Sequence, residues 1–97
     1  MTKLIKIPHL AYTLKIKQPI KGYVAAARRV SMTEGWIHIV TPIKPVQYPV
    51  LAHEIVHILR YIAIDYKMDF ANEEEHFAYL MQYIMNKILG YEMYDKN

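Results

Sequence analysis

Hydrophobic and polar residues alternate along the first half of the chain in the manner of β-strands. Residues 4–7 and 11–18 alternate at every second position and are bounded by Pro8 and Pro19, which end strands because proline cannot donate a ladder hydrogen bond. Residues 36–41 are rich in β-branched and aromatic side chains. Residues 23–31 are a weaker strand prediction, and the turn-like "MTEG" after them indicates an antiparallel hairpin with 36–41.

The pattern changes to helical spacing near residue 49. Pro42, Pro45 and Pro49 break the preceding strand, and proline is tolerated in the first turn of a helix. From residue 49 to 65 the apolar positions recur at steps of four, three and four, which predicts a helix with one buried stripe. That stripe consists of Leu51, Ile55, Ile58 and Ile62.

A second helix is predicted after the polar connection "DYKMDFAN". Asn72 is a suitable N-cap, Glu75 could close a capping box with it, and Gly90 is a natural stop. The apolar stripe of this helix is Phe77, Leu80, Met81, Ile84 and Ile88. The chain therefore predicts a single α+β domain over 1–97, with a small antiparallel sheet in 1–45 followed by two helices in 46–97.

Composition limits the metal ligands that this domain can use and indicates where it is located in the cell. The 97 residues include no cysteine, so a metal would have to be bound by histidine and carboxylate side chains. No apolar run approaches the roughly 20 residues that cross a bilayer, and the N-terminus lacks a continuous signal-peptide core. We therefore expect a soluble, unsecreted, cytoplasmic protein without a membrane partner.

Charge is distributed unevenly between the two halves. Residues 1–48 carry eight Lys or Arg and one acidic residue, whereas residues 49–97 carry four and eight. A basic half can mark a surface for nucleic acid or another anionic partner. However, no motif that combines aromatic and basic residues accompanies the lysines, which suit the solvated face of strands. Nucleic acid is therefore not the expected partner, and binding of nucleic acid or another anionic partner by the basic half is a third, weaker hypothesis.

The segment "AHEIVHILRYIA" (52–63) carries the main candidate chemistry. At 100° per residue, His53 and His57 lie within about 40° of each other on the helix, roughly opposite its apolar stripe. Two imidazoles one turn apart can share one zinc ion, and Glu54, to the side of the pair, can act as general base without ligating. A catalytic zinc usually has a third protein ligand. The second helix offers several candidates, of which Glu75, Glu74 and His76 are the strongest.

The motif resembles that of the zincin metallopeptidases of the gluzincin type, in which a glutamate from a later helix is the third ligand. Glu75 lies 18 residues after His57, and "EHFAYL" (75–80), continuing to Tyr83 and Ile84, is similar to a pattern in short phage and prophage members. The resemblance covers residues 48–89 and implies a minimal zincin-like core. It assigns His53, His57 and Glu75 as ligands and Glu54 as base. Glu74 and His76, which neighbour Glu75 in the chain, stay open as alternative ligands.

The leading functional hypothesis is a zinc-dependent peptidase of a bacterial host cytoplasm, acting on a peptide or protein. Tyr79 and Tyr83 are candidate transition-state stabilisers, as are His76 and His38. Substrate could align along an exposed edge strand, for which "WIHIVT" (36–41) is the best candidate, and a homodimer could complete the groove. The alternative is a metal-stabilised protein without turnover that binds and modulates a host protein.

Overall fold

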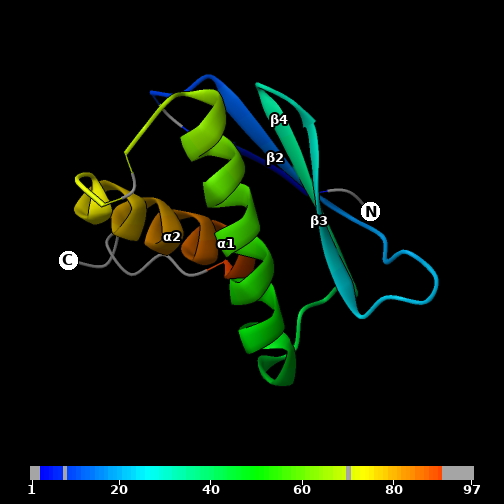
Figure 1. Ribbon diagram of the computed structural model, residues 1–97. Coiled ribbons are helices and arrows are strands. Elements are labelled where there is room, and N and C mark those ends of the chain that lie inside the picture. Colours follow the sequence, from blue (N-terminus) through cyan, green and yellow to red (C-terminus); the bar gives the residue numbers. More distant parts are fainter. Residues whose placement is uncertain (1–2, 8, 70, 91–97) are drawn as a thin grey trace.

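Four strands precede two long helices in the computed structural model, which describes residues 3–7, 9–69 and 71–90 (Figure 1). The strands are β1 (Lys3–Ile7), β2 (Tyr12–Lys17), β3 (Ala25–Ser31) and β4 (Glu34–Ile39). A 3-10 turn, η1 (Pro45–Gln47), leads into helix α1 (Tyr48–Asp65), and helix α2 (Glu74–Leu89) follows. The predicted small α+β fold, with the sheet first, is confirmed.

The sheet has the strand order β1-β2-β4-β3. The predicted hairpin of β3 and β4 is present, and β1 also pairs with β2 in antiparallel fashion. The expectation of a wholly antiparallel sheet is wrong, because β2 and β4 are parallel. The chain reaches this arrangement by running from β2 to the far edge and returning through β4. Residues 36–41 therefore do not form an edge strand as predicted: β4 is internal, and the edges are β1 and β3.

Both helices cover the same face of the sheet, α1 over β3 and β4 and α2 over β1 (Figure 1). Alternate strand residues point into this layer, so that Ile5, Leu14, Ile16, Ile37 and Ile39 are buried there. From α1 the predicted stripe is buried completely: Leu51, Ile55, Ile58 and Ile62 are all 0% exposed. No helix formed by the described residues covers the opposite face of the sheet.

Helix α1 begins with Pro49 in its first turn, as predicted. At its other end, Arg29 of β3 donates two hydrogen bonds to Asp65, from Nε to Oδ2 at 2.7 Å and from Nη2 to Oδ1 at 2.9 Å. This bidentate pair fixes the C-terminal end of α1 to an edge strand. No helix in the described part of the chain is long and apolar enough to cross a membrane.

Helix α2 ends at Gly90, as predicted, with this glycine in the left-handed conformation at φ 76°. Its start differs from the prediction. The N-cap is Glu73 without a side-chain capping bond, so Asn72 does not cap the helix and Glu75 closes no capping box. Instead the Asn72 amide donates to the Asp69 carboxylate at 2.5 Å, and the Glu73 carboxylate accepts a hydrogen bond from the Asp69 amide. These local bonds compete with the capping geometry.

Candidate metal site

The two histidines of the "HEIVH" segment meet on the solvent side of α1. Their Nε2 atoms are 3.2 Å apart, with ring centroids separated by 4.9 Å and ring planes inclined at 77°. Both side chains are exposed. Two nitrogens that bind one tetrahedral zinc ion at 2.0–2.1 Å lie about 3.3 Å from each other. The helix therefore already holds His53 and His57 at the separation that a shared cation requires.

Glu54 has a different environment from the histidines beside it. It is 8% exposed, because it lies where the buried face of α1 meets the solvent face. Within the described residues it makes no hydrogen bond or ion pair. Burial of a carboxyl group without a polar partner is unfavourable. A cation held by the neighbouring imidazoles, or water beside it, would give this group a partner.

The candidate third ligands are not brought to this pair. Glu74, Glu75 and His76 form the first turn of α2, and all three are exposed. Glu75 lies about 160° around the helix from Phe77, the first buried residue of α2. Among residues 3–7, 9–69 and 71–90, no three His, Asp or Glu side chains are close enough together to hold a metal ion. Two of the predicted ligands are thus assembled, and the third is not.

The candidate transition-state stabilisers are held in different ways. Tyr79 is 64% exposed, whereas the Tyr83 hydroxyl donates to the backbone carbonyl of Lys6 at 3.2 Å and so links α2 to β1. His38 is buried on β4, where Nδ1 lies 2.8 Å from the Gln18 carbonyl oxygen and donates to it. Its Nε2 atom is buried without a partner among the described residues. His38 and Tyr83 therefore have structural contacts that the sequence did not indicate.

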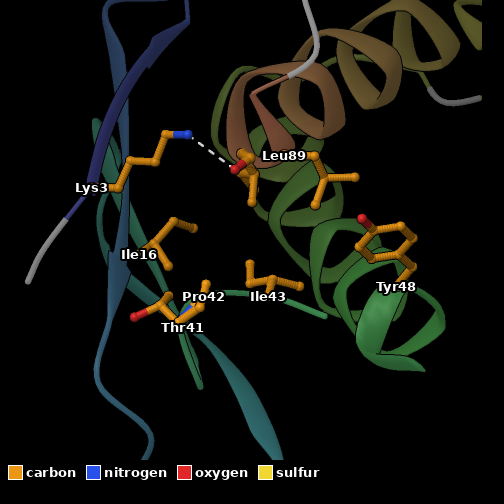
Figure 2. A pocket seen from close by; sticks show the side chains of 8 residues that line it. Lys3, Ile16, Thr41, Pro42, Ile43, Tyr48 and Leu89 are labelled. Carbon is orange, nitrogen blue, oxygen red and sulfur yellow. Dashed lines mark hydrogen bonds between the residues drawn. The ribbon is translucent and has the colours of Figure 1, made fainter. Parts of the chain in front are cut away.

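A pocket of about 330 Å³ lies elsewhere, where the start of α1, the end of α2 and the loop after β4 approach the sheet (Figure 2). Ile43, Tyr48 and Leu89 form much of its wall, and Lys3 Nζ donates to the Ile88 carbonyl oxygen at 3.0 Å across one side. None of the predicted site residues lines this pocket. The histidine pair is therefore a surface feature of α1 and is not part of this pocket.

No protein-family model, curated protein or solved structure matches the chain. The resemblance to zincins therefore depends on the sequence motif alone and stays a prediction.

The sequence did not predict a cluster of two cationic side chains around a tryptophan. Lys17, Arg28 and Trp36 come from three different strands, yet the sheet register brings them together on its uncovered face. The only sequence signal for them is the strand alternation, which places residues on a face but does not say which strands are neighbours.

Proposed function

We propose that the chain binds a divalent metal, preferably zinc, through His53 and His57, and that it acts as a peptidase with Glu54 as general base. The observation that carries the proposal is the 3.2 Å separation of the two Nε2 atoms. Glu54 also supports it, because this buried carboxyl group has no polar partner among the described residues and is the residue to which the motif assigns chemistry. Histidine and carboxylate ligands suit zinc among the first-row divalent metals.

In this proposal the protein residues divide the work. His53 and His57 hold the metal, and the carboxyl group of Glu54 accepts a proton from the attacking water and returns it to the leaving amine. When bound, zinc supplies Lewis-acid chemistry by polarising a carbonyl group and acidifying water. Glu75 stays the predicted third ligand, with Glu74 and His76 as alternatives. Each requires the first turn of α2 to come closer to the histidines when metal binds.

The sheet suggests where an extended substrate would align. Since β4 is internal, the edge strand that packs against α1 is β3. An extended peptide could add to this edge as a further strand. Its main-chain hydrogen bonds would then supply most of the affinity, and side-chain pockets would supply specificity. A peptide or protein substrate is therefore the proposed class.

A second candidate function is a metal-stabilised protein that docks a host protein without turnover. It is favoured by the solvent face of α1, where Val56 is 50% exposed and Ile64 is 61% exposed alongside the histidines. Exposed apolar side chains beside a surface metal site suit a protein interface. The zinc would then fix the orientation of the docking face.

The Glu54→Gln variant separates the two functions. We expect elemental analysis to find about one zinc per wild-type chain, the same in Glu54→Gln, and a large loss in His57→Ala. Hydrolysis of a fluorogenic peptide library should fall by at least about a hundredfold in Glu54→Gln if the chain is a peptidase, since general bases contribute about 10²–10⁴-fold. Absence of zinc from the wild-type chain would refute both functions, and retained hydrolysis in Glu54→Gln would refute the assigned base.

A further inference from the structure

One face of the sheet is not covered by any helix in the part of the chain that the structure describes. The cross-strand register determines which residues lie on this face. We call this the outer sheet face. Its members alternate with the residues that face the helices and are Leu4, Lys6, Thr13, Lys15, Lys17, Ala26, Arg28, Glu34, Trp36 and the buried His38. Four of them are cationic and one is acidic. The face is therefore strongly basic, and its cations come from β1, β2 and β3.

Trp36 occupies the centre of the outer sheet face. In the register it lies directly between Lys15 of β2 and Arg28 of β3, so that neighbouring side chains are about 5 Å apart at Cβ. The Lys17 Nζ atom is 4.1 Å from the centroid of the indole ring, and the Arg28 guanidinium is 5.5 Å from it. Cationic groups thus surround a single aromatic ring.

The indole ring is fixed by Glu34. Its Nε1–H donates to the Glu34 carboxylate at 2.5 Å, and Lys15 pairs with the same carboxylate at 3.2 Å. The Trp36 bond is the main reason that the pKa of Glu34 is held below its ordinary value. Among the described residues, Lys6, Lys17 and Arg28 have no carboxylate partner. The acid is therefore used to orient the ring, while these three cations keep their charge available.

We propose that the outer sheet face binds single-stranded nucleic acid, with a base stacked on Trp36 and the neighbouring phosphates held by Lys17, Arg28 and Lys6. An aromatic platform inside a basic surface is the arrangement that binds single strands without sequence preference, because every base has a π-face. A duplex keeps its bases stacked inside and cannot offer one to the ring. Lys17 leaves the ring for a phosphate when a base stacks there.

From the sequence alone, a nucleic-acid partner is only the third and weakest expectation. That ranking came from the lack of a linear motif combining aromatic and basic residues. The fold supplies the combination across strands, since Trp36 is 19 residues from Lys17 in the chain but lies within 4.1 Å of its Nζ atom.

Trp36 makes the test direct, because it is the only tryptophan in the chain. A labelled oligothymidine should bind with a saturable rise in anisotropy and should quench the tryptophan emission over the same concentration range. With three cations available, the slope of log K against log salt should be no steeper than about −2, at roughly 0.7 per phosphate contacted. Absence of binding at low salt would overturn the proposal.

Variants that each remove one positive charge test whether the oligonucleotide binds at the outer sheet face. Lys17→Gln and Arg28→Gln should each weaken oligonucleotide binding several-fold. Lys87→Gln is the control, because Lys87 also lies over an aromatic ring, 5.6 Å from the centroid of Tyr83, but on α2. It should bind like the wild type. Equal losses in Lys17→Gln and Lys87→Gln would show nonspecific attraction by net charge and overturn the proposal.

The role of the ring itself requires a separate comparison. Trp36→Leu should lose about tenfold in affinity, whereas Trp36→Phe should keep most of it, since stacking on an aromatic ring contributes substantially for each base. Circular dichroism checks that both variants are folded. If the wild type binds inorganic polyphosphate or anionic phosphatidylserine vesicles as tightly as oligothymidine, bases are not being recognised and the proposal is wrong.

Discussion

The two faces of helix α1 differ in burial. Its inner face carries Ile55, Ile58 and Ile62, which are completely buried against the sheet and α2. Its outer face carries His53 and His57, which are exposed and contact mainly each other. The inner face determines whether the domain folds, and the outer face can be altered with little effect on stability. One helix thus separates the fold from its candidate chemistry.

The largest expected effect comes from a deletion on the inner face. Ile58→Ala removes a completely buried side chain between α1 and the sheet and should lower the free energy of unfolding by about 2–5 kcal/mol. His57 precedes Ile58 in the chain but lies on the outer face. His57→Ala should therefore change the free energy of unfolding by less than about 0.5 kcal/mol in metal-free protein. Urea unfolding followed by circular dichroism measures both. Similar losses in the two variants would contradict the division of α1 into two faces.

Zinc should make the outer face contribute to stability as well. If His53 and His57 bind zinc only in the folded chain, a hundredfold excess over Kd stabilises it by about 2.7 kcal/mol. Thermal unfolding with and without zinc should therefore show a higher Tm for the wild type and no rise for His57→Ala. Glu54→Gln should retain the rise, since Glu54 is not a predicted ligand. A zinc-induced rise that persists in His57→Ala would place the metal elsewhere.

Gly35 of β4 lies where the sheet approaches the inner face of α1, close to Tyr12 and Ile58. Its substitution should have the next largest effect. A Cβ atom at this position would collide with the Tyr12 hydroxyl and would lie 3.0 Å from Ile58 Cδ1. Gly35→Ala should therefore cost about 1–3 kcal/mol by overpacking. Urea unfolding should show that Gly35→Ala costs less free energy of unfolding when it is introduced into Tyr12→Phe than when it is introduced into the wild type. An equal cost in both would mean that the clash is not with the hydroxyl.

Tyr12 illustrates how closely this junction is packed. Its hydroxyl is buried and has no hydrogen-bond partner among the described residues. Burial raises the pKa of Tyr12 far above its ordinary value, with the nearby Asp65 charge adding to the effect. The group therefore stays neutral over the whole accessible pH range.

The sequence predicts the local elements well and the long-range arrangement poorly. Strand alternation and the stripe of α1 depend on neighbours a few residues away, so their positions are correct to within about two residues, which is the usual limit for helix and strand ends. The parallel pairing of β2 with β4 depends on where β3 returns, and no local pattern encodes it. The error in placing "WIHIVT" at an edge follows directly from this.

The candidate sites divide in the same way. The His53–His57 pair was predictable because one helical turn fixes both side chains. The position of Glu74, Glu75 and His76 relative to this pair was not, since it depends on how α2 packs against α1. Asn72 was misjudged as a cap because Asp69 competes for it. The cluster around Trp36 could not be predicted without the register that brings three strands together.

The smallest effect concerns the ion pair that fixes the end of α1. The two hydrogen bonds from Arg29 hold the pKa of Asp65 below its ordinary value. The folded chain therefore binds this proton less readily than the unfolded chain, whose carboxyl has a pKa of about 3.9. The stabilisation is complete above that pH and is lost as pH falls through the lower pKa of the folded state.

Asp65→Asn removes this dependence while keeping the shape of the side chain. Between pH 6 and pH 2, the free energy of unfolding of the wild type should fall slightly more than that of the variant, and the two curves should converge at the acidic end. Arg29→Gln should behave like Asp65→Asn, because either substitution removes the pair. Urea unfolding at four pH values measures the difference, which is small because Arg29 is largely exposed. Parallel curves for the wild type and Asp65→Asn would show that the pair contributes nothing measurable to stability.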